Sequence, residues 1–120
     1  MNYNDYCWHD AIIKNIQIDR INPGINDTIK FEIEWPEGKG KATFTFENVY
    51  WVNLDLNFGM IVAEYIDQSF VAENSDFDLI RIKENWLKML STELDLKCYV
   101  IKTNSTGGTI KIISIGFTVE

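Results

Sequence analysis

The sequence predicts an α+β domain, in which a mostly antiparallel β-sheet of about seven strands, strongly twisted or sandwich-like, carries one amphipathic helix. Three observations predict this class. Apolar and polar residues alternate along several short segments, turn residues separate those segments at hairpin distance, and only one stretch has helical periodicity. The chain has 120 residues, of which 46% are hydrophobic, and this favours a single domain over residues 1–120.

Strict alternation marks the strands. The clearest case is TIKFEIEW, residues 28–35, where Ile29, Phe31 and Ile33 share one face of the chain. The short turns between such segments favour antiparallel pairing. The apolar phase slips at Asn48, which predicts a bulge or tight bend between two strands. The expected strands are residues 11–21, 28–35, 42–47, 49–58, 60–66, 96–104 and 109–119.

Residues 76–91 are predicted to form the helix. Ser75 fits the N-cap position, and Asp78 three residues later resembles a capping box. The apolar residues of this stretch cover about half of the helix circumference, so one face must pack against the sheet. The residues expected to be buried on that face are Leu79, Ile82, Trp86 and Leu90.

The sequence Cys7-Trp8-His9-Asp10 combines a thiol, an imidazole and a carboxylate, and so raises the question of catalysis. Neighbouring residues in an extended chain point to opposite sides, whereas catalytic triads are assembled from separate segments. His9 is the only histidine and there are two cysteines, which is a bare minimum for zinc. We therefore expect no catalytic residue, metal or cofactor. Trp8 is expected to anchor the core, with His9 and Asp10 forming hydrogen bonds where the chain leads into the first strand.

The charge is strongly uneven along the chain. The net charge is −7, and residues 42–80 contain seven acidic residues but no Lys or Arg. Such a chain repels nucleic acid and anionic membranes and suits a basic protein partner, although acidity can also serve solubility alone. The residues predicted to form the binding face are Asp55, Glu64, Asp67 and Glu73, with Tyr50, Trp51 and Tyr65 as aromatic anchors.

The location of the protein is predicted from two absences in the sequence. No apolar run approaches the roughly 20 residues that cross a bilayer. The N-terminus has neither the basic region nor the apolar region of a secretory signal. We therefore expect a cytoplasmic protein with two free thiols.

Three stretches together resemble small immunity-protein families linked to bacterial polymorphic toxins, and related uncharacterised bacterial domains. They are WHDA leading into IIKNIQID, then FENVYWVNLDLNFG, and the closing IKTNSTGGTIKIISIGF. The resemblance implies a non-enzymatic cytosolic protein that binds and blocks a cognate toxin, and it implies no catalytic residue. Two alternatives stay open. One is a small-ligand-binding domain with a pocket between helix and sheet, lined by Trp51, Tyr65 and Trp86. The other is an unrecognised hydrolase that uses His9 and Asp10.

Overall fold

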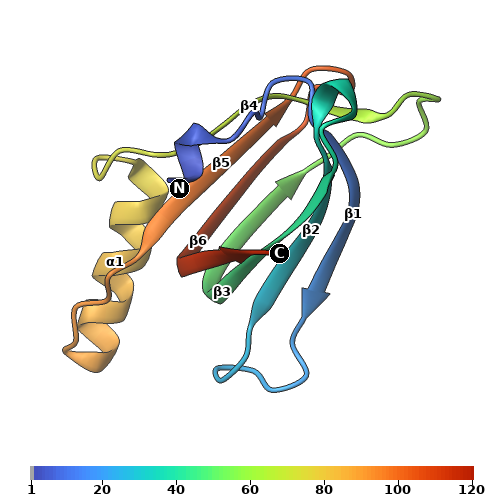
Figure 1. Cartoon of the computed structure of the whole chain (residues 1–120). Coiled ribbons are helices and arrows are strands. Elements are labelled where there is room, and N and C mark those ends of the chain that lie inside the picture. Colours follow the sequence, from blue (N-terminus) through green and yellow to red (C-terminus); the bar gives the residue numbers. More distant parts are fainter. Residues whose placement is uncertain (1) are drawn as a thin grey trace.

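The computed structural model describes residues 2–120, and its strands form a closed six-stranded antiparallel barrel with one helix outside it (Figure 1). The order around the barrel is β1, β2, β3, β6, β5 and β4, and β4 returns to β1 through only two residue pairs. The predicted α+β class with a mostly antiparallel sheet is confirmed. The elements are β1 (Ile12–Asp19), β2 (Thr28–Glu34), β3 (Lys41–Asp55), β4 (Glu64–Val71), α1 (Phe77–Leu90), β5 (Lys97–Thr103) and β6 (Thr109–Val119), with short 3-10 turns at Tyr3–Asp5 and Pro36–Gly38.

The sheet has six strands rather than about seven, because two expected strands are one. Residues 42–47 and 49–58 both fall on or next to β3, a single strand that ends at Asp55. Asn48 has a positive φ of 51°, and the register of β3 against β6 shifts between Val49 and Trp51. The predicted bulge is therefore present, but it bends one strand instead of separating two. The strand expected at 60–66 is also displaced, since β4 spans Glu64–Val71.

The interior of the barrel is filled by the inward-facing residues of the alternating segments. Ile29, Phe31 and Ile33 of β2 are each at most 2% exposed, as their alternation predicted. The N-terminal segment closes one end of the barrel, because Tyr3 and Trp8 are buried in the same cluster. The Tyr3 hydroxyl lies 2.6 Å from the buried Ser69 hydroxyl, which in turn donates to the Val100 carbonyl at 3.0 Å. The buried residues of this barrel core are Tyr3, Trp8, Ala11, Ile13, Ile29, Phe31, Ile33, Phe44, Phe46, Ile66, Tyr99, Ile101, Ile110 and Ile112.

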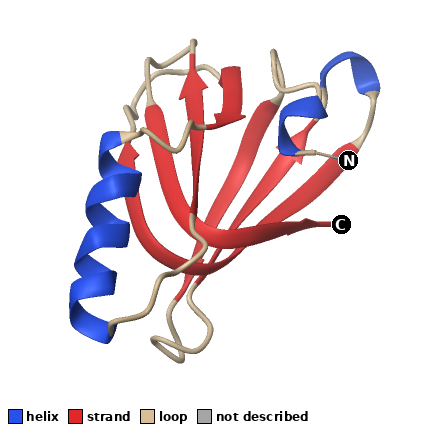
Figure 2. Ribbon diagram, turned by 90° about the vertical axis from the view of Figure 1, so that its left-hand side faces the viewer, coloured by secondary structure: helices blue, strands red, loops and turns tan. Residues whose placement is uncertain are grey.

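Helix α1 lies on the outer surface of the barrel (Figure 2). Its first turns bury Leu79 and Ile82 against outward-facing residues of β5 and β6, among them Cys98 and Ile113. The N-cap is Asp76 rather than the expected Ser75, because the Asp76 carboxylate accepts the Leu79 backbone N–H at 3.1 Å. The single amphipathic helix is confirmed, one residue from the expected start.

The buried face of α1 is shorter than its apolar periodicity predicted. Leu79 and Ile82 are buried, and Trp86 is half-buried with its ring edge-on to Tyr50 at 5.1 Å. Leu90 was expected in the core but is 53% exposed, and this expectation is wrong. The helix therefore packs through its N-terminal half, and its last turn carries apolar side chains into solvent.

Candidate functional site

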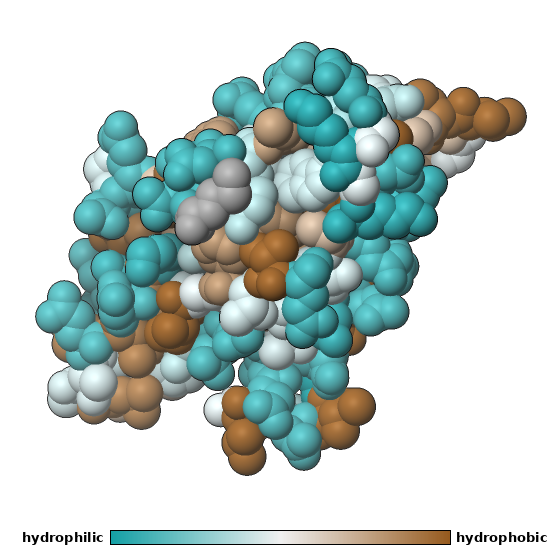
Figure 3. Space-filling model, viewed as in Figure 1, coloured by the Kyte–Doolittle hydropathy of each residue, from teal (hydrophilic) through white to brown (hydrophobic). Residues whose placement is uncertain are grey.

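The loop between β3 and β4 carries the most exposed apolar side chains of the described chain. Residues 56–63 project away from the barrel (Figure 1), and the projection is hydrophobic in the space-filling view (Figure 3). Phe58 is 84% exposed and Ile61 is fully exposed, and Met60 and Val62 are about half exposed. We call residues 56–63 the apolar loop. An exposed cluster of this kind is typical of an interaction surface rather than of ordinary protein surface.

The β5–β6 turn, residues 104–108, holds the two ends of the apolar loop. At one end, Asn57 donates its side-chain amide to the Thr106 carbonyl at 2.9 Å. At the other end, the Ser105 hydroxyl donates to the Ala63 carbonyl at 2.7 Å. Gly108 lets the turn approach β3, since an added Cβ would lie 3.1 Å from the Asp55 carbonyl oxygen. The base of the loop is thus fixed while its apolar tip stays in solvent.

Three of the residues predicted for the binding face surround the base of this loop. Asp55 ends β3 and Glu64 begins β4, so a carboxylate stands at each end of the loop. The Glu64 carboxylate accepts the Thr106 hydroxyl hydrogen bond, and Tyr65 next to it is 36% exposed. The apolar tip therefore has an acidic rim, which we define as Asp55 and Glu64.

The other four predicted residues lie elsewhere. Asp67 is further along β4 and contacts His9, and Glu73 lies beyond the opposite end of β4 from Glu64. Tyr50 and Trp51 lie on β3 next to α1. The structure therefore does not bring the seven predicted residues together on one face.

A groove of about 520 Å³ opens where β3 bends away from β2. One wall is the end of α1, with Trp86 and Leu90, and the opposite wall is the β1–β2 hairpin. Tyr50 and Trp51 line the groove, but Tyr65, which was also predicted for a pocket beside the helix, does not. The hairpin wall is held by an ion pair of 2.9 Å between the Arg20 and Asp27 side chains. The volume is within the range of about 300–1,000 Å³ of small-molecule sites.

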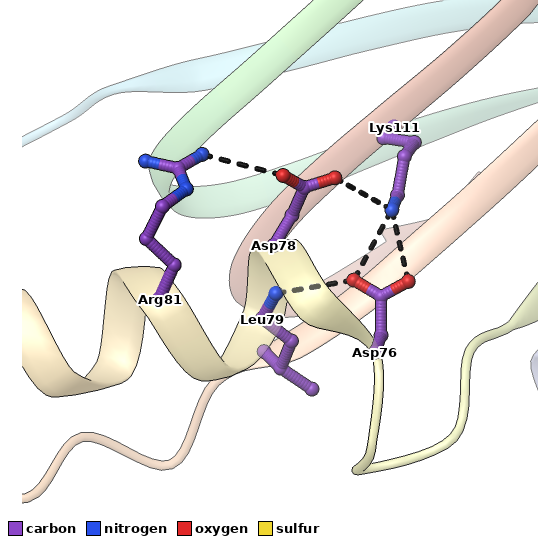
Figure 4. A network of polar contacts seen from close by, with 5 residues as sticks. All are labelled: Asp76, Asp78, Leu79, Arg81 and Lys111. Atoms are coloured by element: carbon purple, nitrogen blue, oxygen red, sulfur yellow. Dashed lines mark hydrogen bonds and ion pairs between the residues drawn. The ribbon is translucent and has the colours of Figure 1, made fainter.

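An ion cluster joins the start of α1 to the barrel (Figure 4). The Lys111 ammonium on β6 lies 2.9 Å from an Asp76 oxygen and 2.8 Å from an Asp78 oxygen. Asp78 also pairs with Arg81 at 3.4 Å, and the Arg81 guanidinium lies over the Trp51 ring at 5.3 Å. In these contacts the acidic and basic side chains neutralise one another, and the two aspartates also lie at the positive N-terminus of the helix. The cluster is therefore assigned a structural role.

The ion cluster shifts the pKa values of its own members. Partial burial by itself would raise the pKa of Asp76, but the Lys111 ammonium and the Leu79 N–H outweigh it and the pKa is lowered. The Lys111 hydrogen bond likewise lowers the pKa of Asp78, against a smaller effect of burial. Burial, with a smaller contribution from the Asp76 carboxylate, raises the pKa of the adjacent Cys98 thiol to about 12. Cys98 is therefore held as an unreactive thiol.

Replacing Lys111 with Met should destabilise the fold by on the order of 2 kcal/mol at neutral pH, because charged hydrogen bonds are lost and two carboxylates stay close together. The folded-state pKa values of both aspartates lie below the ordinary 3.8. The contribution of the cluster is therefore complete above that pH and disappears as the pH falls through the lower folded-state values. Urea unfolding of both proteins from pH 7 to pH 2 measures this, and Lys14→Met is the control. A difference that does not shrink in acid would contradict the assignment.

His9 is exposed at the surface, and its polar contacts within residues 2–120 come from two aspartates. Its Nδ1 atom lies 3.0 Å from the Asp67 carbonyl oxygen, and its ring nitrogens lie 3.7 Å from the carboxylates of Asp10 and Asp67. The hydrogen bond to the Asp67 carbonyl, followed by the Asp10 charge, raises the pKa of His9. His9 and Asp10 do form hydrogen bonds before the first strand, as expected, but both go to β4: His9 through its ring to the Asp67 carbonyl, and Asp10 through its backbone N–H to the Ile66 carbonyl at 2.9 Å. These contacts of His9 include no hydroxyl or thiol from another segment, which a hydrolase would need as its nucleophile.

Sequence reasoning missed the tip of the apolar loop, because it assigned Phe58 and Met60–Val62 to strands. The sequence does contain a signal: the run FGMIVA does not alternate, contains Gly59, and is flanked by the polar residues Asn57 and Glu64. Gly59 has a φ of +94°, a conformation that favours glycine. A non-alternating apolar run around such a glycine predicts a loop better than a strand.

Fold and surface together define a small α+β domain, with a six-stranded antiparallel barrel and an acid-rimmed apolar loop at one end. No protein-family model matches the chain, and no curated protein matches its sequence. Within residues 2–120, no helix combines the length and the apolar character needed to span a bilayer. The same residues contain no group of three or more His, Cys, Asp or Glu side chains placed to hold a metal ion.

Proposed function

We propose that this chain is a non-enzymatic protein-binding domain that inserts its apolar loop into a hydrophobic pocket of a basic partner. The exposure of the loop tip carries the proposal: Phe58 is 84% exposed and Ile61 is fully exposed. Burying apolar surface gains roughly 25 cal/mol per Å², so covering these side chains is strongly favourable. Large apolar anchors surrounded by a polar rim are the usual centre of a tight interface.

The acidic rim gives the partner its chemical character. The carboxylates of Asp55 and Glu64 stand at the two ends of the loop, and the chain has a net charge of −7. A basic protein surface would be attracted over a distance, whereas an anionic membrane would be repelled. An immunity protein that neutralises a toxin by blocking a basic cleft would use such a surface. The short motifs that resemble immunity-protein families support the same class.

A small-ligand-binding domain is the second candidate, and the groove beside α1 favours it. The groove has a suitable volume and is lined by the aromatic rings of Tyr50, Trp51 and Trp86. It lacks Tyr65, and it is open between two walls rather than enclosed by the barrel. A hydrolase receives less support, since His9 contacts two aspartates and no nucleophile within residues 2–120.

Replacing Ile61 with Ser should abolish capture of the partner, or weaken it by about 30-fold or more, because the anchor side chain is lost. The measurement is affinity purification from the source cells, followed by titration of the captured protein by calorimetry. Ile21→Ser is the matched control, since Ile21 is 82% exposed but lies on the distant β1–β2 hairpin. Both variants should melt at the wild-type temperature. If the partner binds Ile61→Ser as tightly as Ile21→Ser, the loop is not the binding surface.

The toxin-neutralising role has its own test with the same partner. Expression of the captured protein alone should arrest growth, and co-expression of the wild-type chain or Ile21→Ser should restore it. Ile61→Ser should fail to restore growth. A captured protein that is harmless when expressed alone would contradict the immunity role and leave a different binding role.

The acidic rim should affect mainly the rate of association. Replacing Asp55 with Asn and Glu64 with Gln removes two charges but keeps groups that can hydrogen-bond. Association with the basic partner should slow by about two- to five-fold at low salt, and the difference should vanish near 1 M salt, where screening acts within about 3 Å. Glu32→Gln with Glu34→Gln on β2 is the control. Stopped-flow rates that are equal for the two double variants would refute a role for the rim.

A further inference from the structure

Strand β3 is paired on its β2 side along its first half only. Its residues up to Phe46 pair with β2, whereas the second half pairs only with β6. The last backbone hydrogen bond on the β2 side runs from the Val49 N–H to the Asp27 carbonyl, at 3.0 Å. Along residues 50–55, no other part of the described chain pairs with this side of β3. We call residues 50–55 on that side the free edge.

The edges of β4 and β1 carry protection that this one lacks. The outer edge of β4 is covered by the N-terminal segment, through Asp10 N–H to the Ile66 carbonyl and Val71 N–H to the Asn4 side chain, both at 2.9 Å. The outer edge of β1 has a register irregularity beside Lys14, and both features discourage pairing with another strand. Along the free edge, residues 53–55 are exposed in succession, and Leu54 is 38% exposed although it is apolar.

The groove described above overlaps the free edge at residues 50–52 of β3. Its lining includes residues 48–52 of β3, with Ile18 from the β1–β2 hairpin and Leu90 from α1 on either side. Leu90 and Ile18 are each about half exposed, so their apolar surface is uncovered. An extended segment that paired with the free edge would therefore also place side chains against apolar walls. Backbone hydrogen bonds and side-chain pockets are the two components of peptide recognition by strand addition.

We propose that the free edge and its groove bind an extended segment of a partner protein as an additional strand. The Asp19 carboxylate lies at the groove and the Asp55 carboxylate at the end of the free edge. Neither forms an ion pair within residues 2–120, whereas Arg20 is already paired with Asp27. The complementary segment therefore has alternating apolar residues and Lys or Arg at its ends. A second copy of this chain fits less well, because each copy carries a net charge of −7 and the same Asp55.

The test uses the full-length ¹⁵N-labelled chain and a synthetic peptide, KVTVTVK, with blocked ends. Titration should give saturable shifts of the amide signals of residues 50–55, and slower hydrogen exchange at those amides in this range that face the free edge rather than β6. KVTPTVK is the control peptide, because proline removes a backbone donor and disfavours the strand. Its affinity should be at least about ten-fold weaker.

Two substitutions locate the peptide on the protein. Leu90→Ala should weaken binding by about three-fold or more, whereas Met89→Ala should not change it. Met89 is adjacent and exposed but does not line the groove. Shifts that are absent from residues 50–55, or equal binding of the proline peptide, would overturn the proposal. A peptide-free dimer with protected amides at 50–55 would also overturn it, in favour of self-pairing. None of these results depends on Ile61, so this proposal and the role of the apolar loop can fail separately.

Discussion

Replacing Trp8 with Ala is expected to lower the free energy of unfolding by about 3–5 kcal/mol, among the largest single effects in the chain. Trp8 is 5% exposed, and its ring packs 4.8 Å from the rings of both Tyr3 and Phe44. Its Nε1–H donates to the Tyr3 carbonyl at 2.8 Å, so the substitution removes a buried hydrogen bond as well as the ring. The cavity would open where the N-terminal segment closes the barrel.

The loss of stability should include part of the contribution of Tyr3, since the Trp8 side chain holds the backbone of Tyr3 in place. Tyr3 packs against several aromatic rings of the barrel core and keeps its hydroxyl on Ser69. Guanidinium-induced unfolding, followed by circular dichroism, measures the change. His9→Ala is the control, because His9 is exposed and should alter stability by less than about 0.5 kcal/mol. A Trp8→Ala protein within about 1 kcal/mol of wild type would show that the N-terminal segment is not part of the core.

The barrel core could be predicted from the sequence, because the alternation of apolar and polar residues is a local property of each strand. Every second residue of 28–35 faces inward, and Phe44 and Phe46 continue the pattern in β3. The number of strands could not be predicted in the same way. A bulge at Asn48 reverses the apolar phase as a turn would, and only the pairing of both halves of β3 with β6 distinguishes the two.

The candidate site depends on contacts between distant segments, which explains why the sequence predicted only part of it. Asp55, Glu64 and Tyr65 were selected for their charge or aromatic character, and the structure places all three at the base of the apolar loop. The tip itself was misassigned, because apolar residues usually indicate burial. The turn at 104–108 holds the two loop ends from 49 and 42 residues away in the chain, and the tip between them stays exposed.

Replacing Leu79 with Ala is expected to cost about 2–5 kcal/mol. Leu79 is 1% exposed and packs with Ile82 against the outer face of β5 and β6, including Cys98 and Ile113. Its backbone N–H is the one that Asp76 caps, so the side chain lies where the helix is most firmly tied to the barrel. Thermal and denaturant unfolding measure the loss, which should include partial loss of helical signal before the sheet unfolds.

Leu90→Ala is the matched comparison, since it removes the same atoms from the same helix. Leu90 is 53% exposed, so the cost should be below about 1 kcal/mol. The difference arises because the helix makes its last aromatic contact with the barrel at Trp86, against Tyr50. Beyond that contact, the apolar face of α1 borders the groove instead of the core. Equal losses for Leu79→Ala and Leu90→Ala would mean that the whole helix is packed, and the groove beside β3 would then be closed in solution. A small loss for Leu90→Ala, together with weaker peptide binding, would assign the end of α1 to recognition rather than to stability.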